Sequence, residues 1–166
     1  MSTELENKLH GYLERRGLKL STAESCTGGL VSHRITNMAG SSAYFTGGVI
    51  AYSYEAKAAL LGVLWETLNS HGAVSRETVL EMARGARKLF DADIALSVSG
   101  IAGPAGGTPE KPVGTTWIGL STSSGEWAGM RRSQFALRNC PRSSFAVRHS
   151  AVARPAAAVA PCMSSA

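Results

Sequence analysis

The hydrophobic pattern near the N-terminus changes its period twice. Apolar side chains at helical spacing predict a helix over residues 3–16, which Gly17 ends. Residues 18–23 alternate apolar and polar side chains, as a strand does. A Gly-rich turn follows at 24–29, and helical spacing resumes at Leu30. We therefore expect a helix, a strand, a Gly-rich turn and a second helix.

Strand and helix patterns continue to alternate through the middle of the chain. A buried strand is expected at 47–52 and a helix at 54–61. A well-marked helix over about 75–90 begins at Ser75, a residue type that commonly caps helix N-termini, and a buried strand follows at 94–99. Such alternation is typical of α/β folds.

A long loop and a hairpin complete the pattern. Residues 100–112 are rich in Gly and Pro, which indicates a loop, and 115–121 with 126–135 predict a β-hairpin. The fold class expected is α/β: a three-layer α/β/α sandwich with a mixed, mostly parallel sheet of about five strands and a C-terminal hairpin.

The last residues depart from this pattern. Residues 136–166 are rich in Ala, Ser, Pro and Arg, lack acidic residues and lysine, and show no sustained helical or strand period. We expect one domain over 1–135 and an irregular tail over 136–166. A frameshift or a divergent end of the gene is our hypothesis for the origin of this tail.

Charge and cysteine content limit the function classes. The net charge is +5, but residues 1–135 hold 13 basic against 12 acidic residues, so the excess belongs to the tail and predicts no nucleic-acid partner. The three cysteines have no metal-ligand spacing, and no metal site or disulfide framework is expected. Without a signal-peptide pattern or a long apolar run, the expected location is cytoplasmic, with no membrane partner.

Six segments, in order along the chain, resemble the CinA C-terminal domain family, whose members include nicotinamide-nucleotide amidases. These segments are 23–29 (AESCTGG), 39–45 (AGSSAYF), 51–57 (AYSYEAK), 71–75 (HGAVS), 99–104 (SGIAGP) and 107–114 (GTPEKPVG). The resemblance implies hydrolysis of the carboxamide of nicotinamide mononucleotide, with no cofactor. It also implies a small-molecule nucleotide as substrate, and for protein partners we expect a homo-oligomer, a dimer.

The resemblance assigns the catalytic roles to three residues. Ser25 is the expected nucleophile, Lys57 the base, and Tyr52 a hydrogen-bonding partner of this pair or of the substrate. A lysine acts as a base only if its pKa falls well below about 10.4. Taken alone, these residues have plainer roles: Ser25 as a helix cap, Lys57 as a solvated helix residue and Tyr52 as a packing residue at a strand end.

Further residues are expected to contact the substrate. Amide N–H groups at Gly28 and Gly29 can serve either a developing oxyanion or a nucleotide phosphate, and the sequence leaves both uses open. The full set of expected substrate-binding residues is Thr27, Gly28, Gly29, Ser99, Gly100, Thr108, Lys111 and Arg138.

Several features leave other assignments open. Cys26 is a rival nucleophile because it adjoins the helix start. Tyr54 and Ala105 stand where the family usually has Asn and Asp, and Asn139 stands where it has an arginine thought to hold the substrate phosphate; Arg138 is the possible replacement. A catalytically impaired nucleotide-binding module and a damage- or competence-related interaction protein are the alternative functions.

Overall fold

The computed structural model describes residues 4–132. The predicted tail at 136–166 and the candidate residue Arg138 lie outside the described residues. Within 4–132, no helix is long and apolar enough to cross a membrane.

Helices and strands alternate along the described chain. In order they are α1 (Glu4–Arg16), β1 (Leu20–Glu24), α2 (Leu30–Thr36), the 3-10 helix η1 (Ser41–Ala43), β2 (Phe45–Ile50), α3 (Tyr54–Leu61), α4 (Trp65–His71), α5 (Arg76–Leu89), β3 (Ile94–Gly100), β4 (Thr115–Thr122) and β5 (Glu126–Arg132). The expected helices at 3–16, 54–61 and 75–90 are confirmed within a residue or so.

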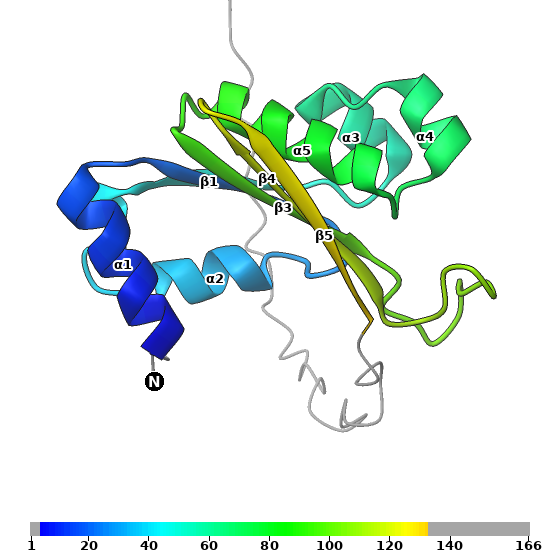
Figure 1. Ribbon diagram of the computed structural model, residues 1–166, viewed down its shortest axis with the longest axis horizontal. Coiled ribbons are helices and arrows are strands. Elements are labelled where there is room, and N and C mark those ends of the chain that lie inside the picture. The colour runs from blue at the N-terminus through cyan, green and yellow to red at the C-terminus, as the bar shows by residue number, and fades with distance from the viewer. Residues whose placement is uncertain (1–3, 133–166) are drawn as a thin grey trace, which may run out of the picture.

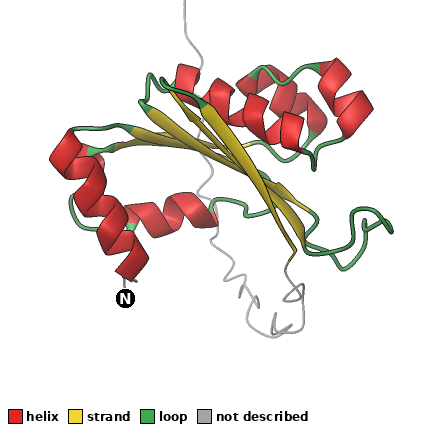
Figure 2. Cartoon of the chain, in the orientation of Figure 1, coloured by secondary structure: helices red, strands yellow, loops and turns green. Residues whose placement is uncertain are grey.

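The five strands form one mixed sheet in the order β2-β1-β3-β4-β5. β1 pairs in parallel with both β2 and β3, whereas β3 with β4 and β4 with β5 are antiparallel. β4 therefore runs against the other four strands. Helices α1 and α2 lie on one face of the sheet and α3, α4 and α5 on the other (Figures 1 and 2). The predicted three-layer α/β fold is confirmed.

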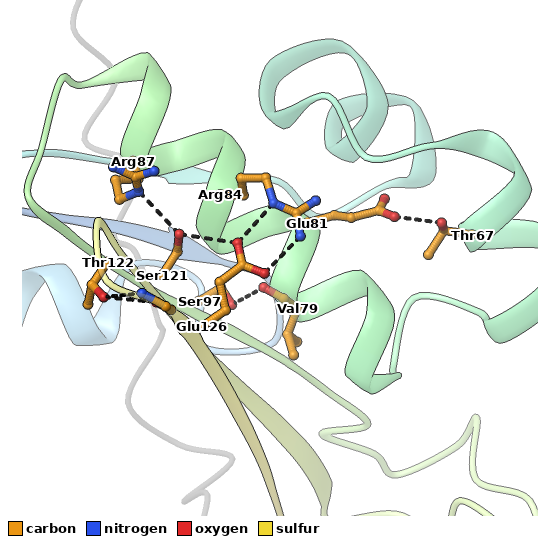
Figure 3. Close-up of polar contacts among 10 residues, drawn as sticks. Thr67, Val79, Glu81, Arg84, Arg87, Ser97, Ser121, Thr122 and Glu126 are labelled. Carbon is orange, nitrogen blue, oxygen red and sulfur yellow. Dashed lines mark hydrogen bonds and ion pairs between the residues drawn. The ribbon is translucent and has the colours of Figure 1, made fainter.

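Both apolar packing and polar contacts hold α5 against the sheet. Its inward face is apolar and fully buried at Val79, Met82, Ala83 and Ala86. Around this core, Arg84 forms two hydrogen bonds with Glu126 of β5, Arg87 donates to Ser121 of β4, and Ser97 of β3 donates to the Val79 carbonyl (Figure 3). The position of α5, and with it one layer of the fold, is thereby set.

The opposite face of the sheet is less completely covered. An open groove of about 500 Å³ lies between α1, α2 and the sheet, and its lining is mainly apolar. It is lined by Leu9 and Leu13 of α1, Ile35 of α2, and Leu96 and Leu120 of the sheet, among others. Trp127 of β5 is also exposed, and strand pairing puts it opposite Leu120.

Two details of the fold differ from expectation. Helix α4 was not expected, because its sequence WETLNSH has no apolar stripe and its N-cap residue, Leu64, makes no side-chain cap. Strand β2 begins at Phe45 and ends at Ile50, two residues earlier than predicted. The shift leaves Ala51 and Tyr52 in the connection to α3, where their carbonyl groups are free for other contacts.

Candidate active site

Ser25 lies at the carboxyl end of the central parallel strand. It directly follows β1, and its N–H donates to the Val98 carbonyl of β3 at 2.9 Å. A tight turn then reaches α2 through Gly28 and Gly29, whose positive φ angles of 59° and 100° favour glycine. The N-cap of α2 is Gly29 rather than Ser25. The plainer role for Ser25, a helix cap, is therefore wrong.

Lys57 approaches Ser25 from the α3 side of the sheet. Ser53 caps α3 by accepting from the Ala56 N–H, and the helix then directs Lys57 and Leu61 inward as its buried residues. The Lys57 side chain is fully buried, and its Nζ lies 2.9 Å from Ser25 Oγ. The alternative of a solvated helix lysine is therefore wrong. The structure brings together the two residues of the expected dyad.

The other neighbours of Lys57 Nζ are both hydrogen-bond acceptors. The amine donates to the carbonyl oxygens of Ala51 at 2.8 Å and Tyr52 at 3.1 Å. A neutral amine has two N–H groups and one lone pair. Since carbonyl oxygens only accept, they take the two N–H groups and leave the lone pair for the Ser25 hydroxyl proton. This arrangement suits a lysine that removes a proton from serine.

Burial favours the uncharged form of this lysine. It lowers the pKa of Lys57, and the nearby Cys26 thiol acts in the opposite direction. Within residues 4–132 no carboxylate pairs with Lys57 to stabilise its charge. Both observations act in the direction that a lysine base requires.

Tyr52 contacts the pair through its backbone only. Its carbonyl accepts from Lys57, whereas its side chain is 75% exposed. The alternative of a packing role at a strand end is therefore wrong. A substrate contact by the exposed ring stays a prediction.

The expected substrate-binding residues of β3 and of the loop after it lie in two groups. Ser99 is buried and donates to the Ala73 carbonyl at 2.7 Å, so its hydroxyl fixes the segment between α4 and α5. Gly100 lies against Cys26 Sγ and Thr116 Oγ1, where a side chain at 100 would not fit.

Thr108 and Lys111 hold the long loop in place. The Lys111 N–H donates to Thr108 Oγ1 at 3.0 Å, and Lys111 Nζ donates to the His71 carbonyl at the end of α4 at 2.7 Å. Tyr54, at a position where the family usually has Asn, accepts from the Ala73 N–H at 3.3 Å on the same connection. These contacts are with the chain itself, so substrate contacts by Thr108 and Lys111 remain predictions.

The start of α2 is already occupied by a carboxylate. The N–H groups of Gly29, Val31 and Ser32 donate to Glu24, which is 1% exposed. They are not free for an oxyanion or a phosphate. Closer to Ser25, the N–H groups of Cys26 and Thr27 donate to no oxygen within residues 4–132.

Cys26 is a weaker candidate nucleophile than Ser25. Its thiol is half-buried, and burial raises its pKa; Lys57 opposes this only when it is protonated. A thiol with a raised pKa contains little of the reactive thiolate at neutral pH. Among the described residues no group of His, Cys, Asp and Glu is arranged to hold a metal ion.

Comparisons with known proteins agree with the fold and the motifs. The CinA C-terminal domain model matches residues 2–155. A putative competence-damage inducible protein of Halothermothrix orenii is 56% identical over 124 residues, covering 75% of this chain and 30% of that protein. A CinA-like protein of Shewanella denitrificans is 51% identical over 141 residues, covering 82% of this chain and 33% of that protein. The chain thus spans about a third of the length of these relatives.

Solved structures show the same likeness. The competence/damage inducible protein CihA from Agrobacterium tumefaciens has a TM-score of 0.77 and 44% identity, with 80% of this chain and 82% of that chain covered. A CinA superfamily protein from Escherichia coli has a TM-score of 0.76 and 29% identity, with coverages of 80% and 77%. This chain belongs to the CinA C-terminal domain family.

Proposed function

We propose that this chain hydrolyses the carboxamide of nicotinamide mononucleotide to nicotinic acid mononucleotide and ammonia. Ser25 is the nucleophile and Lys57 the general base. The observation that carries this proposal is the 2.9 Å contact between Ser25 Oγ and the buried Lys57 Nζ. The choice of substrate rests on the family resemblance, since members of the family include amidases for this nucleotide.

In the first step, Ser25 Oγ attacks the carboxamide carbon as Lys57 Nζ takes the hydroxyl proton. The carbonyl π bond opens, and its electron pair moves to the oxygen. The N–H groups of Cys26 and Thr27, next to Ser25 and donating to no oxygen within 4–132, are the donors we assign to this oxyanion. A low-dielectric site makes such donors more effective than they are in water.

In the second step, the tetrahedral intermediate collapses and the carbon–nitrogen bond breaks. Lys57 returns its proton to the leaving nitrogen, which departs as ammonia. An acyl ester on Ser25 remains. Lys57 then takes a proton from water and the hydroxide attacks the ester. The bond from carbon to Ser25 Oγ breaks as Lys57 returns the proton to this oxygen, and the pyridine carboxylic acid is released and loses its own proton to solvent. One water is consumed for each ammonia produced.

The direct test is an ammonia-release assay with nicotinamide mononucleotide, run on the full chain. Ammonia and nicotinic acid mononucleotide are expected in equal amounts. A nucleotide that raises the thermal stability of the chain without ammonia release would contradict the proposal and favour a catalytically impaired nucleotide-binding module. Nicotinamide riboside, which lacks the phosphate, is the matched comparison for the contribution of that group.

A further inference from the structure

Glu24 is a second buried charged side chain beside Ser25, and the dyad makes no use of it. It is the last residue of β1, and its side chain lies on the α2 face of the sheet, whereas Lys57 comes from the α3 face. Its carboxylate accepts four hydrogen bonds: from Gly29 N at 3.0 Å, Val31 N at 3.1 Å, Ser32 N at 2.8 Å and Ser32 Oγ at 2.6 Å.

These bonds join the two ends of the turn that carries Ser25. Glu24 precedes the turn, and its donors lie in the last residue of the turn and the first residues of α2. The backbone at the start of the turn is also held on both sides: Ala51 N donates to the Glu24 carbonyl at 2.8 Å, and Ser25 N donates to Val98 at 2.9 Å. The carboxylate therefore closes the turn, whose first residue must meet Lys57.

An ionised carboxylate can accept all four of these hydrogen bonds. Three of the donors are backbone N–H groups, which cannot reverse direction, and a proton on Oε2 would face the N–H groups of Gly29 and Val31. Burial acts to raise the pKa of Glu24, but the hydrogen bonds, led by the Ser32 hydroxyl, outweigh it and lower the pKa below its ordinary value. An anion at a helix start is also favoured by the helix dipole.

We propose that Glu24 is a positioning residue for the Ser25–Lys57 pair: its carboxylate is a permanent internal anion that fills the start of α2 and fixes the turn bearing the nucleophile. The inference rests on the proposed role of Ser25 as nucleophile. One consequence is that the substrate phosphate binds elsewhere, because the helix start is filled by the chain itself.

The test is chemical rescue of a Glu24→Ala variant of the full chain. The readout is the rate at which a fluorophosphonate probe labels Ser25, checked by mass spectrometry of the labelled peptide. We expect labelling to slow by about 10- to 100-fold, the effect of a small misplacement of a reacting group. Sodium formate, a carboxylate of the size removed, is expected to restore the rate in a concentration-dependent way.

Three controls separate positioning from a general loss of structure. Formamide, neutral and similar in size, should not restore labelling, and sodium chloride at equal ionic strength should not either. A Glu66→Ala variant, which removes an exposed acidic residue from the first turn of α4, should label at the rate of the unaltered chain with or without formate.

The proposal is overturned if Glu24→Ala labels as fast as the unaltered chain, or if formate and formamide restore labelling equally. Should Glu24→Ala fail to fold, Glu24→Gln and Ser32→Ala are measured instead. Labelling of both at the unaltered rate would equally refute the proposal.

The probe needs no nucleotide. Rescue by formate without ammonia release from nicotinamide mononucleotide would therefore sink the amidase proposal and leave this one standing. An unaltered chain whose Ser25 is never labelled would overturn both.

Discussion

Lys57 of α3 and Glu24 of β1 are both fully buried ionisable side chains near Ser25. They lie on opposite faces of the sheet, and their hydrogen-bonding partners are of opposite kinds. Lys57 meets two carbonyl oxygens and one hydroxyl, and no carboxylate among residues 4–132. Glu24 meets three N–H groups and one hydroxyl at the start of a helix.

The difference decides which side chain keeps its charge. The pKa of Lys57 is lowered by burial, which favours the neutral amine and leaves a lone pair for Ser25. The pKa of Glu24 is also lowered, but by hydrogen bonds that outweigh burial, which favours the anion. The same direction of shift thus favours a neutral amine at Lys57 and an anion at Glu24. The predictions below test the two sides of this comparison.

The largest effect is expected on removing the nucleophile. Ser25→Ala should reduce ammonia release from nicotinamide mononucleotide by at least about 10³-fold, because no hydroxyl remains for Lys57 to deprotonate. The neighbouring Cys26→Ser variant is the matched control, and it should keep most of the activity because burial raises the pKa of the Cys26 thiol and leaves little reactive thiolate. Loss of activity in Cys26→Ser with retention in Ser25→Ala would reverse the assignment.

Removing the base should have the next largest effect. Lys57→Met keeps an unbranched apolar stem and should lower kcat by about 10²- to 10⁴-fold, the usual contribution of a general base. Lys57→Arg should not rescue the rate, because a guanidinium does not deprotonate in proteins. Lys88→Met, at an exposed site in the last turn of α5, is the control and should leave kcat unchanged. Normal turnover in Lys57→Met would remove Lys57 from the mechanism.

For Glu24, we expect a contribution to the free energy of unfolding that depends on pH. Its folded-state pKa lies below the unfolded value of about 4.3. The stabilisation that its carboxylate gives to the folded state is therefore complete above that pH and is lost as the pH falls below it. In urea titrations between pH 7 and pH 3, Glu24→Gln should lose about 1–3 kcal/mol at neutral pH and show a shallower fall in acid. The exposed Glu66→Gln is the control. An unaltered acid profile in Glu24→Gln would show that the carboxylate is not ionised in the fold.

The smallest effect is expected at Tyr52. Tyr52→Phe keeps the backbone carbonyl that contacts Lys57, so probe labelling of Ser25 should stay within roughly twofold of the unaltered rate, a change well below 1 kcal/mol. If the exposed ring contacts the nucleotide through its hydroxyl, KM should rise while labelling stays constant. A slowed labelling rate would place the hydroxyl, rather than the carbonyl alone, next to the dyad.

The fold was predictable from the sequence because most elements carry a clear period. The apolar stripe of α5, the glycine after α3 and the Ser-Ser-Gly turn at 123–125 between β4 and β5 are all local signals. α4 is short, lacks a side-chain cap and has no apolar stripe, so no local signal marks it. The homo-oligomer and the cytoplasmic location expected from the sequence stay predictions.

The candidate site was predictable only in part. The meeting of residues 25 and 57 followed from the family resemblance, because a separation of 32 positions gives no contact by itself. In the structure the reason is topological: β2 lies next to β1, and α3 follows β2 directly.

The role of Glu24 was missed, although its signal was present: an acidic residue at a strand end, followed by two glycines and a helix with no side-chain cap of its own. The contacts of Ser99 with Ala73 and of Lys111 with His71 join residues 26 and 40 positions apart and have no such signal.

The most direct test of a neutral lysine beside Ser25 is an NMR titration of the lysine side chains, with Lys57→Met used to assign the Lys57 signal. Burial and the two carbonyl contacts predict that the Lys57 signal titrates below the ordinary lysine value of about 10.4. A Lys57 signal that titrates at that ordinary value or above it would contradict the proposed base.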